Sequence, residues 1–189
     1  MKTIIRMISL VLALVSLFAL CACSAQESPE GVEIPSGFLM AENEKTDYYF
    51  FYPSDWLLDR NDAGMTSAYV SENDFSNVSV TAFTASVEYP TLLDYAEKYY
   101  FTQFEDNFNN LKTEKNQDGS LKRSSLKIDG CEALAVNYTA SFSGENYAFR
   151  VWFISRGGYI YTVLYTAKEA LFEPHLEVAT AIAENIKFR

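Results

Sequence analysis

Apolar positions alternate over two long stretches in the second half of the chain. Residues 146–156 and 159–167 carry aromatic and β-branched side chains on both faces, and Gly157-Gly158 separates them. A pair of glycines can adopt the positive φ angles of a two-residue turn. The pattern therefore predicts a β-hairpin whose strands are buried on both faces and lie in the middle of a sheet.

Shorter stretches show the same period of two. The sequence TDYYFFYPSDW predicts a strand rich in aromatic residues that ends at Pro53, because proline has no N–H for the ladder. The sequence NQDGS at 116–120 predicts a turn. Further strands are expected at SAYVS, NVSVTAF, LKRSSLKID and CEALAVNYTASF, the last with Leu134, Val136, Tyr138 and Phe142 on one face.

Two other stretches have apolar residues three or four positions apart, which is typical of amphipathic helices. The first follows Pro90, with Thr91 as its N-cap, and the second begins at Pro174, a residue favoured in a first turn. Their apolar stripes are Leu92, Ala96, Tyr100, Phe104, Phe108 and Leu111, and then Leu176, Ala179, Ile182, Ala183 and Ile186. Strands of period two with two such helices predict an α/β fold, an α/β/α sandwich around a central antiparallel sheet.

The first residues have the pattern of a bacterial lipoprotein signal. Lys2 and Arg6 precede an apolar run from Met7 to Ala22, which is shorter than the roughly 20 residues of a membrane span. Cys23 follows a small residue, with the aliphatic Leu20 three positions before it. Cys21 fits less well, because bulky Leu20 precedes it. The alternative is an ordinary secretory signal with incidental cysteines.

We therefore predict three segments. Residues 1–22 form a lipoprotein signal peptide, residues 23–36 a flexible linker that begins at a lipidated Cys23, and residues 37–189 the folded domain. Such a linker would hold the domain roughly 20 Å from the bilayer. The expected location is the extracytoplasmic face of a bacterial cell membrane, with diacylglycerol and palmitate on the cysteine.

Charge and cysteine content narrow the class of protein. The formal net charge is −10, and removal of Lys2 and Arg6 with the signal makes it −12. An acidic chain is unsuited to nucleic acid and to anionic membrane surfaces, which attract basic proteins. Once Cys23 carries lipid and Cys21 is removed, Cys131 is the remaining cysteine, so the domain has no intramolecular disulfide.

The residues that carry chemistry are sparse, and we predict no catalytic, metal or cofactor site. His175 is the single histidine, and a solvated or capping role suits it better than a catalytic triad. Cys131 lacks partners for a zinc site. Gly157-Gly158 belongs to the hairpin rather than to a phosphate loop. The following carboxylates do not have the spacing of a calcium loop: Asp59, Asp62, Glu72, Asp74, Asp94 and Glu97.

Several local features resemble the PsbP-like domains over residues 38–188. They are Tyr52-Pro53 with Trp56 three residues later, Ile128-Asp129-Gly130 before the hairpin, and the Tyr-rich strand that ends at Thr166-Ala167. The resemblance implies an α/β/α sandwich that acts as a binding or assembly module outside the cytoplasm. Some plant members bind calcium, but no matching ligand set is found in this sequence.

Two functional hypotheses follow. The favoured one is a non-catalytic, lipid-anchored module that binds another envelope protein, a peptide or a small ligand through exposed aromatic residues. Candidate binding residues are Tyr48, Tyr99, Tyr147 and Tyr159, although such rings can also simply fill the core. The alternative is an envelope hydrolase with two carboxylates about 5 to 10 Å apart in a pocket, one of them with a raised pKa.

Overall fold

The computed structural model describes residues 29–41, 44–60, 65–105 and 108–189. The chain divides into two compact units, 1–31 and 32–189, and every element named below lies in the second. The predicted signal peptide and Cys23 lie outside the described residues, so their assignment stays a prediction.

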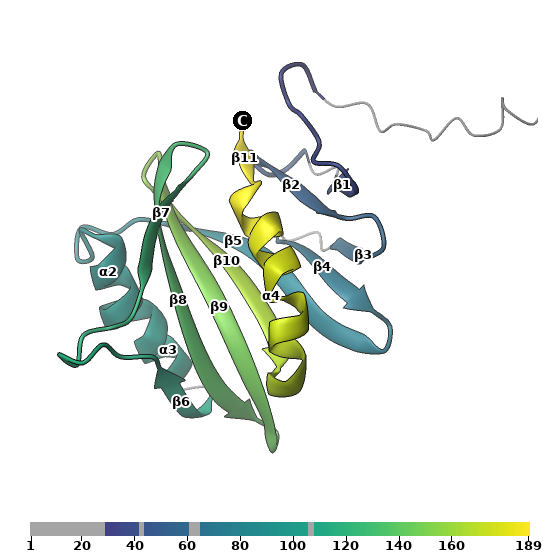
Figure 1. Ribbon diagram of the computed structural model, residues 1–189. Coiled ribbons are helices and arrows are strands. Elements are labelled where there is room, and N and C mark those ends of the chain that lie inside the picture. Colours follow the sequence, from purple (N-terminus) through teal and green to yellow (C-terminus); the bar gives the residue numbers. More distant parts are fainter. Residues whose placement is uncertain (1–28, 42–43, 61–64, 106–107) are drawn as a thin grey trace, which may run out of the picture. The chain divides into compact units, whose positions relative to one another are not determined.

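An antiparallel eight-stranded sheet forms the centre of this unit (Figure 1). Side chains of its central strands alternate between two buried faces, as the apolar pattern predicted. In spatial order they are β3 (Leu57–Arg60), β4 (Thr66–Ser71), β5 (Asp74–Thr84), β10 (Tyr159–Lys168), β9 (Glu145–Arg156), β8 (Cys131–Phe142) and β6 (Asn109–Thr113), and β7 (Ser124–Ile128) also pairs with β8.

The predicted hairpin is confirmed as β9 and β10. Tyr159 pairs with Arg156, which leaves Gly157 and Gly158 as the two turn residues. Their φ angles are 57° and 82°, the positive values that a tight hairpin turn requires. The two strands lie in the middle of the sheet, between β8 and β5.

A second, smaller sheet has the order β1-β2-β11. Strand β2 (Tyr48–Pro53) is the predicted aromatic strand, and it ends at the proline as expected. Strands β1 (Phe38–Ala41) and β11 (Lys187–Phe188) were not predicted. The carboxylate of Asp129 holds β11 in place, because it accepts hydrogen bonds from the backbone N–H of Phe188 and from Nζ of Lys187.

Helix α4 (Glu169–Glu184) covers one face of the large sheet. It begins five residues before Pro174, so the predicted start at that proline is wrong. The apolar residues Leu171 and Phe172, which precede the proline, also pack into the core. Their burial favours a helix that starts N-terminal to Pro174. Ile186 lies beyond the end of the helix but is still buried.

The other face is covered by three short consecutive helices, α2 (Leu92–Tyr95), the π-helix η2 (Ala96–Tyr100) and α3 (Phe101–Glu105). Thr91 is confirmed as the N-cap, since its side chain accepts a hydrogen bond from the N–H of Asp94. Leu111, which was expected at the end of this helix, lies in β6 instead. Leu111 fitted the four-residue spacing of the helix because it packs against the same core, although it does so from a strand.

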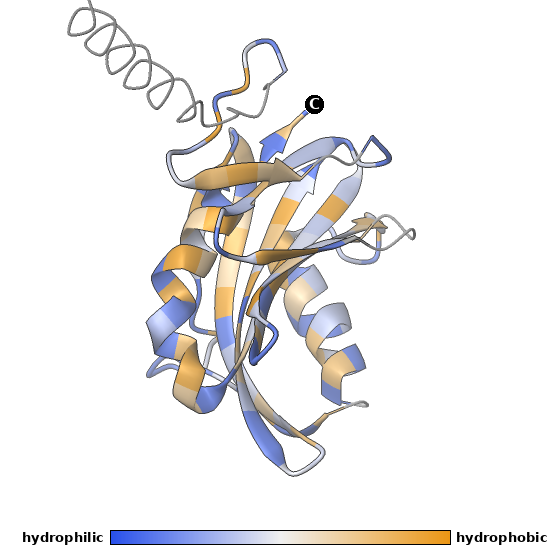
Figure 2. Cartoon of the chain, turned by 90° about the vertical axis from the view of Figure 1, so that its right-hand side faces the viewer, coloured by the Kyte–Doolittle hydropathy of each residue, from blue (hydrophilic) through white to orange (hydrophobic). Residues whose placement is uncertain are grey.

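The sheet separates two apolar cores, and Figure 2 shows helices on opposite sides of it. Trp152, Tyr161 and Tyr165 pack on the side of α4, whereas Val151 and Phe153 pack on the side of α2 and η2. The alternation of these residues along β9 and β10 matches the prediction. The unit is therefore an α/β/α sandwich around an antiparallel sheet, as predicted from the sequence.

Candidate functional site

Part of one sheet face has none of the described helices over it. The α2–α3 segment packs on β6, β8 and β9, and the same face of β3, β4 and β5 remains accessible. The exposed fractions are 73% for Phe75, 44% for Phe83 and 39% for Leu57. Val78 and Val80, which alternate with these positions along β5, are buried in the core under α4. The sheet is thus covered on both faces only in part.

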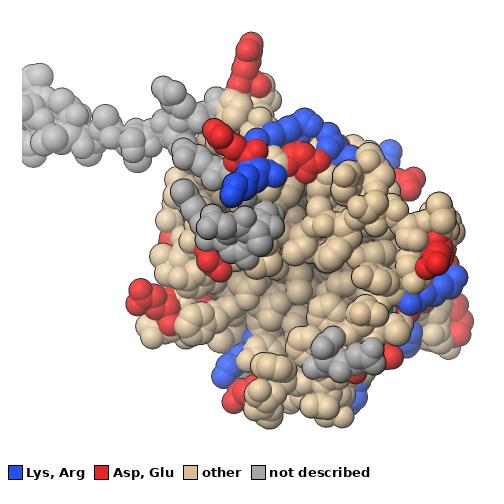
Figure 3. Space-filling model, turned by 180° about the vertical axis from the view of Figure 1, so that it is seen from behind, with Lys and Arg blue, Asp and Glu red and all other residues tan. Residues whose placement is uncertain are grey.

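We call this accessible surface the open face. Tyr69 and Phe75 stack on it with ring centroids 6.2 Å apart. Figure 3, viewed from the side opposite to that of Figure 1, shows a broad uncharged expanse with charged side chains around its rim. Asp59 of the edge strand β3 brings one carboxylate to the margin of this face, since it pairs with Ser67, which in turn pairs with Ser79. The open face consists of Leu57, Tyr69, Phe75, Asn77, Ser79, Thr81 and Phe83.

The pockets among the described residues include one of about 390 Å³ and one of about 310 Å³. The smaller one, which we call the aromatic pocket, lies where β5 ends at the edge of the open face. Phe83 belongs to both surfaces. The pocket is lined by Phe83, Thr84, Ser86, Glu88, Tyr89, Tyr95 and Tyr99.

The three tyrosines of the aromatic pocket contact one another. The ring centroid of Tyr99 lies 5.3 Å from that of Tyr95 and 5.5 Å from that of Tyr89, within the range of favourable aromatic pairs. Tyr95 is 4% exposed and forms the base of the group, while Tyr99 is 36% exposed. Burial raises the pKa of the Tyr95 phenol, which therefore stays neutral at physiological pH.

Local hydrogen bonds hold the pocket in shape. The N–H of Ala85 donates to the carbonyl of Gly158 at 2.8 Å, which ties the start of the loop to the hairpin turn. The side chain of Ser86 accepts from the N–H of Glu88 at 3.2 Å. On the other wall, Tyr99 lies in the π-helix η2. Such wide turns occur frequently at functional sites.

The four predicted binding tyrosines have different environments. Tyr48 is only 4% exposed, and its hydroxyl donates to Oγ1 of Thr66 inside the core, so its expected place on the surface is wrong. Its strand is buried because β2 packs against the large sheet under α4. Tyr99 and Tyr159 are exposed and Tyr147 is half-buried.

The structure does not bring these tyrosines together. Tyr99 lies in η2, on the side of the sheet that carries the open face, whereas Tyr159 neighbours Tyr161 on the side of α4. Tyr147 contacts Phe149 near the opposite end of β9. Of the four, Tyr99 alone lines one of the two pockets described above.

Sequence reasoning missed Phe83, Tyr89 and Tyr95 as members of a site. A signal was present, because these rings and Tyr99 flank a short loop that contains Pro90. The i, i+4 spacing of Tyr95 and Tyr99 also places both rings on one side of a helix.

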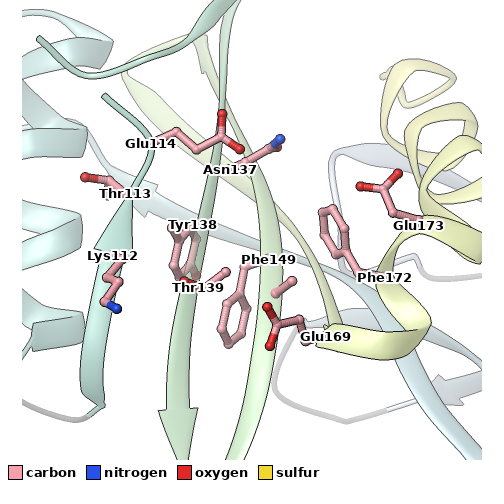
Figure 4. Close-up of a pocket in the computed structure, with 11 residues that line it drawn as sticks. Lys112, Thr113, Glu114, Asn137, Tyr138, Thr139, Phe149, Glu169, Phe172 and Glu173 are labelled. Carbon is pink, nitrogen blue, oxygen red and sulfur yellow. The ribbon is translucent and has the colours of Figure 1, made fainter. Parts of the chain in front are cut away.

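The larger cavity, which we call the polar pocket, lies between the first turns of α4 and strand β6 (Figure 4). Asn137 and Thr139 of β8 lie on its floor, and the amide oxygen of Asn137 accepts a hydrogen bond from Arg150 at 3.3 Å. Its lining includes three carboxylates, those of Glu114, Glu169 and Glu173.

These three glutamates are exposed, and Glu114 forms an ion pair with Lys122 at 2.7 Å. A general acid needs a raised pKa, which burial away from water would provide. The carboxylates of the polar pocket therefore do not have the environment that the hydrolase hypothesis requires.

The resolved carboxyl pKa shifts within the described ranges are downward. The hydrogen bond from Lys98 is the main cause of the lowered pKa of Asp94, and hydrogen bonds from Ser120 lower the pKa of Asp118. Partial burial opposes the change at Asp129, but hydrogen bonds from Phe188 and Lys187 still lower its pKa. These groups are held in the ionised form.

His175 takes part in a structural contact that its sequence context did not indicate. Its Nε2 atom lies 2.9 Å from Oδ2 of Asp74, and its ring meets the edge of Trp56 at a centroid distance of 6.2 Å. Cys131 is half-buried and free. Among the described residues, no group of three or more His, Cys, Asp or Glu side chains is arranged to hold a metal ion.

The described helices include none with the length and apolar character needed to cross a membrane. The architecture is that of an α/β/α domain with an accessible sheet face and a small aromatic pocket. By its sequence the chain belongs to the PsbP-like protein family, whose pattern matches residues 6–188. A search of curated proteins finds no match.

Three solved structures share this fold. CyanoP, the PsbP of Synechocystis sp. PCC 6803, is 16% identical with a TM-score of 0.55 and covers 86% of this chain and 98% of its own. A Pseudomonas aeruginosa protein of unknown function, described as a putative regulator, is 14% identical (TM-score 0.51; 80% and 97% covered). LpqN, involved in cell envelope biogenesis of Mycobacterium tuberculosis, is 15% identical (TM-score 0.51; 74% and 82% covered). At these identities the likeness concerns the fold alone.

Proposed function

We propose that this protein is a lipid-anchored, non-catalytic binding module on the extracytoplasmic face of a bacterial membrane, where it docks another envelope protein through the open face. Cys23 is the point of attachment, and the linker to residue 36 gives the domain freedom to reach its partner. Membership of the PsbP-like family and the fold shared with LpqN support an envelope role.

The observation that carries the proposal is the open face itself. In a chain with a net charge of −10, this part of the sheet presents uncharged side chains and exposed aromatic rings. Large exposed apolar side chains that gather on one surface, here Leu57, Phe75 and Phe83 around the polar centre of β5, mark interaction sites. Aromatic side chains are also enriched at protein interfaces, where one or two of them supply much of the binding energy.

The hydrolase alternative finds less support. The polar pocket holds exposed glutamates, and the carboxyl pKa shifts resolved in the described residues point toward ionisation rather than proton retention. A binding role needs neither a desolvated acid nor a nucleophile.

A photo-crosslinking amino acid tests the docking surface in intact cells. Placed at Ser79, in the middle of the open face, it is expected to capture one discrete partner. Placed at the exposed Ala170 of α4, on the opposite side of the sheet, it is expected to capture far less of that partner. Equal capture from both positions, or capture from neither, contradicts the proposal. A Ser79→Lys variant should abolish co-purification of the same partner.

The anchor is tested by metabolic labelling with an alkyne analogue of palmitate. Wild type and Cys21→Ala are expected to incorporate the label and to fractionate with membranes. Cys23→Ala should lose both properties, because it lacks the thiol that accepts the diacylglycerol. Labelling that persists in Cys23→Ala would overturn the assignment of this residue.

A further inference from the structure

The aromatic pocket has an unusual combination of lining groups. Four of its lining residues are aromatic, and Glu88 supplies a carboxylate beside them. No Lys or Arg is among the described lining residues. Aromatic faces are electron-rich, so rings and a carboxylate at one site both favour a positive charge and repel a negative one.

The nearby basic side chain does not oppose a cation. Lys98, the cationic neighbour of Tyr99 in η2, is paired with Asp94 at 2.6 Å, so its charge is balanced. The net charge of −10 adds a long-range attraction for cations. A cationic ligand is therefore favoured over a neutral one of the same shape.

The lining also selects the type of cation. A primary ammonium has three N–H donors that are strongly hydrated, and an aromatic wall does not replace these hydrogen bonds. A quaternary ammonium has no N–H group, and its methyl groups can contact the rings directly. Groups of aromatic side chains are the recognised site for this chemistry.

The exposure of the rings fits a small ligand that covers them. Tyr95 is 4% exposed and forms the base, while Tyr99 and Phe83, at 36% and 44%, form walls that a ligand would shield from water. The volume of about 310 Å³ lies at the lower end of the range for ligand sites, roughly 300–1,000 Å³.

From these observations we infer that the aromatic pocket binds the trimethylammonium group of a small cationic ligand of the choline type. Tyr89, Tyr95, Tyr99 and Phe83 contact the methyl groups, and Glu88 balances the charge. This goes beyond the proposed function, because it assigns a small-molecule site beside the docking surface rather than a protein partner.

Calorimetric and NMR titration of the full chain, kept in a maltoside detergent, provides the test. Choline is expected to bind saturably. Its uncharged carbon isostere, 3,3-dimethyl-1-butanol, should bind at least about tenfold more weakly, because it keeps the shape but lacks the charge that the rings attract. Equal affinity for the two compounds, or no binding of choline to the folded protein, overturns the inference.

Variants locate the site. Tyr99→Ala should weaken choline binding about tenfold, whereas Tyr99→Phe, which retains the ring, should keep most of it. Phe142→Ala removes an exposed aromatic ring that does not line the pocket and should leave the affinity unchanged; circular dichroism confirms that each variant is folded. A loss of affinity in Phe142→Ala equal to that in Tyr99→Ala would contradict the assignment.

A phosphocholine detergent in competition with choline distinguishes two sources of the group. Displacement of choline by its micelles supports a lipid headgroup as the ligand, and retention of choline supports a free metabolite. Crosslinking from Ser79 reads out the docking surface separately, so failure of one proposal is distinguishable from failure of the other.

Discussion

Nε2 of His175 lies 2.9 Å from Oδ2 of Asp74, across 101 residues of sequence. The contact joins the first half of α4 to the start of β5. Asp74 also accepts a hydrogen bond from the N–H of Ser76 at 2.9 Å, and its side chain is only 18% exposed. The Asp74 carboxylate therefore stabilises both the start of β5 and its contact with α4.

Replacement of Asp74 by alanine is expected to lower the free energy of unfolding at pH 7 by about 1–2 kcal/mol, the usual cost of a lost charged hydrogen bond. Partial burial disfavours the charge, but hydrogen bonds from Ser76 and His175 hold the pKa of Asp74 below 3.8. The ionised form thus stabilises the fold above that pH, and the contribution is lost as the pH falls through the lowered folded-state pKa.

Urea denaturation at pH 7 and at pH 3 or below measures this difference. The gap between wild type and Asp74→Ala should narrow in acid. Asp55→Ala removes an exposed aspartate and serves as the control. A gap that stays constant with pH would show that the carboxylate charge is not the cause.

The hydroxyl groups of Tyr100 and Tyr138 lie 3.0 Å apart in the core under η2. Each single Tyr→Phe change leaves one buried hydroxyl unpaired and should cost about 1–3 kcal/mol, whereas the double change removes both groups and should cost less than the sum. A double-mutant cycle in chemical denaturation reports the coupling. Additive effects would mean that the hydroxyl pair contributes nothing of its own.

Gly157 has a φ angle of 57°, which most side chains adopt only with strain. Gly157→Ala is expected to destabilise the hairpin by about 1 kcal/mol. Gly157→Asn should cost less, because asparagine tolerates this conformation in two-residue turns. Thermal unfolding measures the stability of the two variants. If the alanine variant is as stable as the asparagine variant, the prediction is wrong.

Tyr161 donates a hydrogen bond to Asp47, which also pairs with Arg156 at 3.2 Å. Burial is the main cause that raises the pKa of Tyr161 to about 12, and the bond to Asp47 adds to it. Because this pKa exceeds the unfolded value of 10.0, the neutral phenol stabilises the fold fully below pH 10, and the contribution is lost as the pH rises toward 12.

Carbon-13 NMR of labelled tyrosine follows this titration directly. Asp47→Ala should move the titration midpoint of Tyr161 toward pH 10, because the carboxylate that accepts a hydrogen bond from the phenol is gone. A midpoint near 10 in the wild type would contradict the prediction.

The strongly periodic elements could be predicted from the sequence. The hairpin of β9 and β10, the Thr91 cap and the alternation of Trp152 with Phe153 depend on neighbours close in the chain, so the local pattern carries the information. The PsbP-like resemblance rests on the hairpin together with the Tyr52-Pro53 and Ile128-Asp129-Gly130 segments, and it is confirmed by the family match.

Features that depend on distant packing could not be predicted. Burial of Phe172 starts α4 before Pro174, and β11 is too short to have a recognisable pattern. The contact of His175 with Asp74, and the burial of Tyr48 where β2 packs against the large sheet, require the tertiary arrangement.

The open face was hidden for a similar reason. The alternation of Val78 and Val80 with Ser79 and Thr81 is typical of any strand with one wet face. The open face is accessible because the α2–α3 segment packs on β6, β8 and β9 instead. The local sequence pattern of β5 does not contain this information.

The strand order has a consequence for folding kinetics. β8, β9 and β10 follow one another in sequence and can form a meander early, whereas β5 must find its place beside β10 after a separation of about 80 residues. Closing such a long loop is entropically slow. We expect the meander to act as the nucleus, with β3, β4 and β5 joining late, so an interrupted folding reaction would expose the aromatic edge of β10 to aggregation.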